Sequence, residues 1–75
     1  MTVPIDVNDP DAALEFCARL IEDAGELPER AEDFAASVIE KTESMAEWID
    51  TESRVTDKIA AALENMRAGV DKWNR

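Results

Sequence analysis

Glu40, Glu43 and Glu47 are the first candidates in this sequence for a metal-binding or acid–base site. On a helix, intervals of three and four residues place these carboxylates on one face, where they can bind a divalent cation or transfer protons. A cation site, however, needs ligands that converge from several directions, and the chain has no histidine with which to build a di-iron site in a bundle. We therefore expect no metal ion and no cofactor.

Cys17 is the second candidate for chemistry. The chain contains one cysteine, no histidine and no tyrosine, so a cysteine nucleophile would have no imidazole base beside it. A free cysteine on an apolar helix face behaves as a small hydrophobic residue. A single cysteine also excludes an internal disulfide and agrees with a reducing compartment. The sequence therefore predicts a cytoplasmic protein that is not an enzyme.

The elements that position these residues are predicted to be helices of one domain covering residues 1–75. A chain of 75 residues, 45% of them hydrophobic, has room for a single small core. Apolar residues do not alternate with a period of two, so no strand is expected. Residues 1–9 have no periodic pattern and are expected to be extended. The predicted fold is all-α: a three-helix bundle, or a helical hairpin with one further helix, and no sheet.

The first helix is predicted over about residues 10–24. Asp9 is placed to cap this helix, Pro10 suits its first position, and Gly25 is expected to end it in the left-handed conformation. Its apolar residues recur at the spacing of one buried face. They are Ala13, Leu14, Cys17, Leu20, Ile21 and Ala24.

The second helix is predicted over about residues 28–50, with Pro28 at or near its first position. Its buried line, which we call the seam, continues at alternating intervals of four and three residues. The seam consists of Ala31, Ala35, Val38, Thr42, Met45 and Ile49. Because the other helices are shorter, part of this helix is expected to stay uncovered.

The third helix is predicted over about residues 57–73, with Thr56 as its cap. Gly69 interrupts it at a cost of roughly 1 kcal/mol relative to alanine, so either the helix frays there or a neighbour packs closely. Short connections between the helices predict antiparallel neighbours. The apolar stripe of this helix consists of Ile59, Leu63, Met66, Val70 and Trp73.

The chain is strongly acidic, with 18 acidic and 8 basic residues and a net charge of −10. Direct binding to nucleic acid or to an anionic membrane is therefore unfavourable, and a charged partner is expected to be basic. No run approaches the roughly 18 apolar residues of a membrane span, and Met1 to Pro4 do not begin a signal peptide. Basic residues of the third helix are expected to offset some acids of a neighbouring helix.

One face of the second helix carries a row of carboxylates opposite the seam. At about 100° per residue they fall within an arc of roughly 100° and extend over roughly 30 Å. This acidic face consists of Glu29, Glu32, Asp33, Glu40, Glu43, Glu47 and Asp50. One interpretation is an ordinary solvated face. The other is mimicry of nucleic-acid phosphates, because a surface selected only for solubility more often contains lysines among its acids.

Trp48 and Trp73 lie on or beside buried stripes, so core packing is the first interpretation for both. Tryptophan is also enriched among interface hot spots. Trp48, beside Met45 and Ile49, is placed to form the apolar centre of an interface with an acidic rim. The residues predicted to contact a partner are Glu29, Asp33, Glu40, Glu43, Glu47, Trp48 and Asp50.

The stretch from Phe34 to Trp73 contains the segments Phe-Ala-Ala-Ser-Val, Trp-Ile, Val-Thr-Asp-Lys and Ala-Leu-Glu-Asn-Met. In these segments it resembles small helical proteins encoded by phages and mobile elements. The resemblance implies a short accessory protein that binds and blocks a larger host protein, as inhibitors of CRISPR effectors (anti-CRISPR proteins) do. It implies no particular site residue.

Two functional hypotheses follow. The first is a viral type of inhibitor that places its acidic face on the basic, nucleic-acid-binding surface of a larger protein in the host cytoplasm, without binding nucleic acid or a membrane itself. The second is a structural or regulatory homo-oligomer, such as a homodimer, that assembles through the seam.

Overall fold

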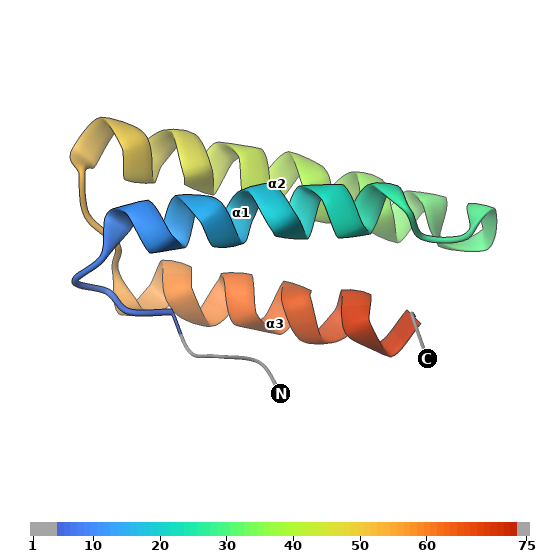
Figure 1. Ribbon diagram of the computed structural model, residues 1–75. Coiled ribbons are helices and arrows are strands. Elements are labelled where there is room, and N and C mark those ends of the chain that lie inside the picture. The colour runs from blue at the N-terminus through green and yellow to red at the C-terminus, as the bar shows by residue number, and fades with distance from the viewer. Residues whose placement is uncertain (1–4, 74–75) are drawn as a thin grey trace.

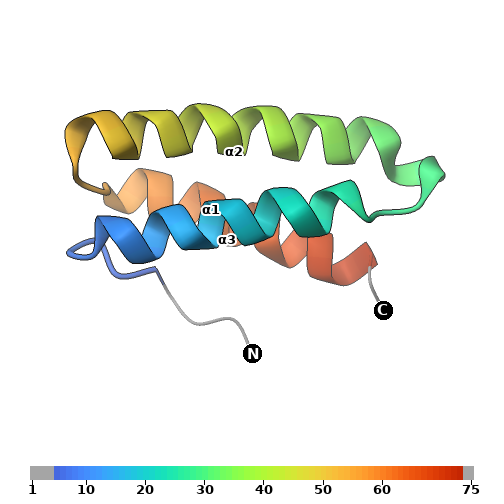
Figure 2. The same cartoon turned by 45° about the horizontal axis from the view of Figure 1, so that its top comes forward.

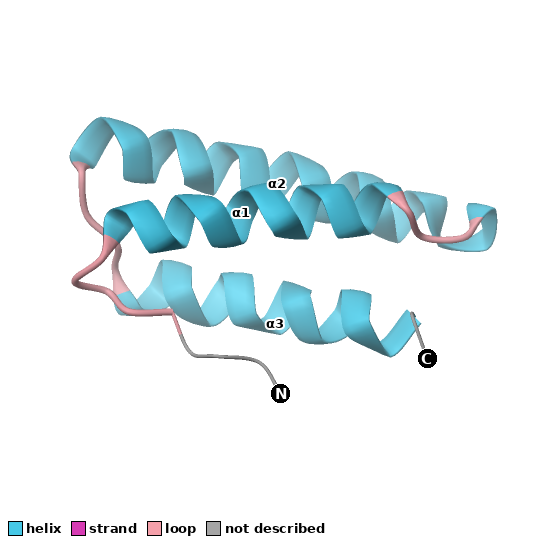
Figure 3. Cartoon of the chain, viewed as in Figure 1, coloured by secondary structure: helices cyan, strands magenta, loops and turns pink. Residues whose placement is uncertain are grey.

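Three helices make up the fold of the computed structural model, which describes residues 5–73 (Figure 1). They are α1 (Pro10–Gly25), α2 (Glu32–Glu52) and α3 (Asp57–Trp73), and a short 3₁₀ turn, η1 (Glu29–Ala31), precedes α2. No strand occurs in the part of the chain that the structure describes (Figure 3). The all-α fold predicted from the sequence is confirmed.

The helices form an up-down-up bundle in which α2 runs antiparallel to both α1 and α3 (Figures 1 and 2). α1 packs most extensively against α2. With 21 residues, α2 is about 31 Å long by its rise per residue. It therefore spans most of the molecule's longest dimension of 35 Å.

Polar caps set the two helix starts that the sequence predicted correctly. The carboxylate of Asp9 accepts a hydrogen bond from the N–H of Ala12 at 3.1 Å, and Pro10 occupies the first position of α1. The hydroxyl of Thr56 accepts one from the N–H of Ile59, also at 3.1 Å. Both caps satisfy backbone donors that have no partner within the helix.

The segment before α1 is less extended than expected. The N–H of Asn8 donates to the carboxylate of Asp6 at 2.8 Å, and the N–H of Asp9 donates to the carbonyl of Asp6 at 3.0 Å. These bonds form a turn that leads directly into the helix. Residues 1–4 of the predicted extended segment lie outside the described residues.

α1 ends at Gly25, as predicted, but not through the left-handed conformation that glycine tolerates. Gly25 is the last residue of the helix, and its φ is not positive. The helix ends because its final turn tightens: the N–H groups of Glu26 and Leu27 donate to the carbonyls of Asp23 and Ala24, each at 3.2 Å. Such bonds across three residues satisfy carbonyls at a helix end without a left-handed residue.

Pro28 lies directly before η1 and not at the first position of α2, so the helical segment begins near Pro28 as predicted, but with a 3₁₀ turn. The ψ of Pro28, 157°, is extended, and its carbonyl accepts a hydrogen bond from the N–H of Ala31 at 2.8 Å, which closes η1. The turn brings Ala31 into the core, and α2 begins at Glu32. α2 ends at Glu52, beyond the predicted Asp50, and Ser53 then takes the left-handed conformation with φ 55°.

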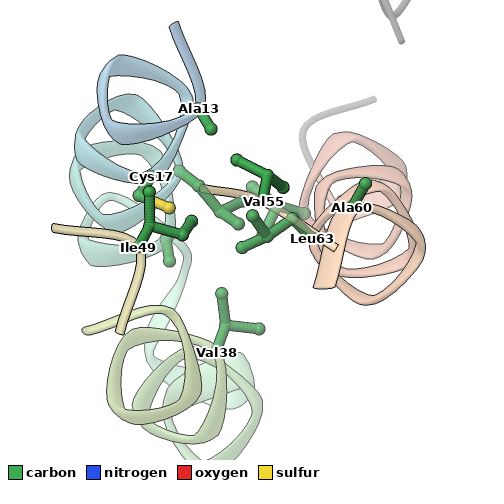
Figure 4. Packing of buried hydrophobic residues seen from close by; sticks show 10 residues of the cluster. Ala13, Cys17, Val38, Ile49, Val55, Ala60 and Leu63 are labelled. Carbon is green, nitrogen blue, oxygen red and sulfur yellow. The ribbon is translucent and has the colours of Figure 1, made fainter. Parts of the chain in front are cut away.

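The apolar faces of the three helices meet in one core. Figure 4 shows Cys17, Val38 and Leu63, one from each helix, pointing toward the centre of the bundle. The predicted stripes supply most of this core, and the principal exception is Trp73, which is 37% exposed. The buried hydrophobic residues are Ala13, Cys17, Leu20, Ala24, Ala31, Val38, Ile49, Val55, Ala60, Leu63 and Val70.

Gly69 lies inside α3, and a neighbour packs closely on it. A Cβ atom at this position would lie 2.7 Å from Cζ of Phe34 on α2. The missing side chain therefore makes room for an aromatic ring. Of the two explanations considered for this glycine, close packing is the correct one, and α3 continues through it to Trp73.

Candidate partner-binding surface

All seven carboxylates of the acidic face are exposed. Six of them project from α2, which is unbroken from Glu32 to Glu52, so the helical rotation keeps them opposite the seam along its length. The seventh, Glu29, belongs to η1. The single helix predicted for residues 28–50 is therefore a short 3₁₀ turn followed by one continuous α-helix.

Within residues 5–73, no ion pair neutralises a carboxylate of the acidic face. The ion pairs found in this range join Arg19 to Glu15 at 3.4 Å, and Arg67 to Asp23 at 2.6 Å and to Asp71 at 2.9 Å. Arg67 therefore offsets acidic charge on α1 and on its own helix. The negative charge of α2 is left facing solvent.

Arg67 connects α3 to α1 through these bonds. Burial alone would lower the pKa of its guanidinium, but hydrogen bonds to Asp23 and Asp71, together with their charges, outweigh burial and raise the pKa above its ordinary value. The expectation that basic residues of this helix offset acids of a neighbouring helix is therefore met by Arg67, whereas Lys58 and Lys72 are exposed and form no ion pair within the described residues.

The two tryptophans are neither fully buried nor free. Trp48 is half-buried, and Trp73 is 37% exposed. An arginine guanidinium lies over each ring at 5.4 Å from the ring centroid: Arg54 over Trp48, and Arg30 over Trp73. Trp48 also borders a shallow depression together with Glu47. Trp48 is therefore the aromatic residue next to the acidic face, whereas Trp73 covers the end of the bundle near η1.

The seam is part of the interior of the single chain. Val38, Thr42 and Ile49 are 2%, 0% and 0% exposed. Ile49 therefore does not contribute to an apolar surface around Trp48, which corrects the prediction that the two residues share an interface. Ala31 is buried as well, whereas Ala35 and Met45 are half-buried, so most of the seam is not accessible for assembly.

Cys17 has the environment of a core residue. It is 1% exposed, and burial raises the pKa of its thiol to about 11. The thiol is therefore protonated at neutral pH, and the protonated form is a poor nucleophile and a poor metal ligand.

The described residues also bear on metals and membranes. Within residues 5–73, no group of three or more carboxylate, thiol or imidazole side chains is arranged to hold a metal ion. Over the same range, no helix combines the length and the apolar character needed to cross a bilayer.

Comparison with known proteins adds no relative. No protein-family model matches the sequence, and no match was found among curated proteins or solved structures.

Three apolar residues next to the acidic face, Leu27, Ala36 and Ile39, were assigned no role from the sequence, and Ala35 was assigned only to the seam. Leu27, Ala35, Ala36 and Ile39 line shallow depressions at the α1–α2 connection and along α2. The sequence contains one indication of this apolar surface: Ile39 is a large aliphatic residue that lies outside the seam and close to acidic positions. What this arrangement can do chemically is bind cationic groups, with apolar contact beside them.

Proposed function

We propose that this chain is a non-enzymatic inhibitor that binds a larger basic protein in the host cytoplasm and covers that protein's nucleic-acid-binding surface. The observation that carries the proposal is the row of seven exposed carboxylates, none of them paired within residues 5–73, one on η1 and six along the continuous helix α2. The resemblance to phage-encoded accessory proteins is in keeping with it.

The physical basis is competition between two rows of negative charge. The acidic face is roughly 30 Å long, comparable to about one turn of duplex nucleic acid. Because the bundle holds α2 in place, the carboxylates are presented without the entropic cost of ordering a flexible acidic tail. A basic groove that binds phosphates would therefore attract this surface, with fast association and a strong dependence on ionic strength.

Charge reversal on the acidic face tests the proposal. One variant carries Glu40→Lys, Glu43→Lys and Glu47→Lys, and a matched control carries Glu15→Lys, Glu22→Lys and Glu26→Lys, all at exposed positions on α1 or at its end. Both change the net charge from −10 to −4 and so differ in where the charge is placed. The control also removes the exposed Arg19–Glu15 ion pair, a contact that contributes no more than about 1 kcal/mol. Circular dichroism verifies that both remain helical.

The readout is affinity capture from the source cell, or from its phage host, at graded salt concentration. We expect the wild type and the α1 control to retain the same nucleic-acid-binding protein at low salt, and the α2 variant to lose it. Equal capture by the two reversed variants would mean that the location of the charge is irrelevant, and the acidic face would then be only a solvated surface.

A further inference from the structure

Two shallow depressions run along the edge of the acidic face and share a wall. The first lies at the α1–α2 connection, and its lining includes Leu27, Ala35, Ala36 and Ile39. The second continues along α2 and is again lined by Ala36 and Ile39. We call Leu27, Ala35, Ala36 and Ile39 the apolar strip. Because the two depressions share two of these residues, the strip is one continuous surface.

Carboxylates of the acidic face border the apolar strip along its whole length. Glu29 and Glu32 line the first depression, and Glu40, Glu43 and Glu47 line the second. All five are exposed. A group that rests on the strip therefore has anionic oxygens beside it at every point.

The apolar strip has room for a partner. Leu27, Ala35 and Ile39 are only half-buried, although Leu27 and Ile39 pack partly against the core, and Ala36 is exposed. Apart from its chain neighbours and the backbone of its own helix, Gly25, which lines the first depression, has no atom within 4 Å of the position where a Cβ would lie. Apolar side chains with this much exposure gain free energy when a second apolar surface covers them.

The charge on the rim selects what can cover the strip. A second copy of this chain would bring five like charges against five, and phosphates would be repelled in the same way. A segment of a protein with lysine or arginine on one side and aliphatic residues on the other matches both features. Helices dock in this way when their apolar face enters a groove and their charged residues reach its rim.

We propose that the apolar strip binds a cationic amphipathic helix of the partner protein, with aliphatic side chains on the strip and lysine or arginine side chains on the carboxylates around it. This inference rests on the proposed function and specifies which segment of a basic partner is recognised. Apolar contact also fixes a register, which a row of charges alone does not.

Two synthetic peptides of about 18 residues, or five helical turns, test the proposal. Both contain the same numbers of leucine and lysine residues; one places the leucines on a single helical face, and the other distributes them around the helix. Fluorescence anisotropy of the labelled peptides measures their binding to the full chain. We expect the amphipathic peptide to bind at least about tenfold more tightly than its isomer, a difference of about 1.4 kcal/mol.

Filling the strip provides the second measurement. Ala36→Gln leaves the charge unchanged but places a larger polar side chain on the shared wall, and Ala61→Gln makes the same change at an exposed position of α3. We expect Ala36→Gln to reduce the preference for the amphipathic peptide to less than about threefold, and Ala61→Gln to leave it unchanged. Both proteins should keep the helical spectrum of the wild type.

Failure of this inference is distinguishable from failure of the proposed function. Equal affinity for the two peptides, or an unchanged preference in Ala36→Gln, would overturn the apolar strip as a docking site. This would hold even if the charge-reversal variant of Glu40, Glu43 and Glu47 no longer bound either peptide. In that case the purely electrostatic surface would stand. Absence of binding by both peptides would overturn the inference as well.

Discussion

The ring of Phe34 occupies the space where a side chain at position 69 would be. This contact joins α2 to α3 at a point where the sequence offered only a glycine in the middle of a helix. Glycine lowers the intrinsic stability of the helix, and the packing of the half-buried aromatic ring offsets this loss.

We predict that Gly69→Ala lowers the free energy of unfolding by roughly 1 kcal/mol. Alanine gains about 1 kcal/mol in helix propensity, but its Cβ at 2.7 Å from the Phe34 ring overpacks the contact, which costs about 1 to 3 kcal/mol. Urea unfolding of Gly69→Ala alone and in a Phe34→Leu background measures the difference. A stabilising effect of the same size in both backgrounds would show that the ring does not restrict position 69.

The buried thiol of Cys17 makes the stability of the fold depend on pH. The pKa of its thiol is about 11 in the folded chain, against an ordinary value of 9.0, because burial disfavours the thiolate. Between these values the unfolded thiol has lost its proton while the folded thiol retains it. Stability contributed by the buried neutral thiol is therefore complete below pH 9.0 and decreases as the pH rises toward about 11.

We predict that the free energy of unfolding of the wild type falls more steeply over this alkaline range than that of Cys17→Ala. The comparison removes contributions of lysine and arginine residues, which the two proteins share. Chemical unfolding at several pH values measures both slopes. Parallel slopes would contradict the assignment of Cys17 as a buried, protonated thiol.

The conformation of Ser53 ends helix α2. This residue has φ 55°, and its N–H donates to the carbonyl of Ile49 at 2.8 Å. The left-handed conformation satisfies an end carbonyl of the helix but is unfavourable for a residue with a Cβ. It also reverses the chain so that Val55 enters the core only two residues later.

We predict that Ser53→Gly raises the free energy of unfolding by about 0.5 to 1 kcal/mol, because glycine adopts the left-handed conformation without the steric cost. Ser37→Gly, at an exposed position inside α2, is the control and should lower it by about 0.5 kcal/mol. Thermal unfolding of the two variants gives the comparison. Destabilisation by both would mean that Ser53 is not strained.

The existence and faces of the helices were predictable because apolar spacing and caps are local properties. Asp9 and Thr56 cap through the N–H groups of Ala12 and Ile59, each three residues further on, so both caps are visible in the sequence. The start of α2 was not, because proline fixes φ but leaves ψ free, and Pro28 takes an extended ψ to form η1. The spacing of apolar residues does not indicate a helix boundary that depends on a ψ angle or on a tertiary contact.

In the folded protein, the location of the acidic residues determines the proposed binding surface more than the total net charge does. Arg67 reaches Asp23 on α1 and Asp71 on α3, so the bundle offsets acids away from α2. The acidic face itself could be predicted because it depends only on helical rotation. The apolar strip could not, since it combines Leu27 from the connection with residues of α2 that only the folded chain brings together.

A competition experiment between this chain and nucleic acid shows whether the acidic face occupies a nucleic-acid-binding surface. The protein captured by the wild type is bound to its labelled nucleic acid, and the wild type, the α2 charge-reversal variant and the α1 control are each titrated into the complex. We predict that the wild type and the α1 control displace the nucleic acid and that the α2 variant does not. Equal displacement by the two variants, or binding of the wild type without displacement, would contradict the claim that the acidic face of α2 takes the place of nucleic acid.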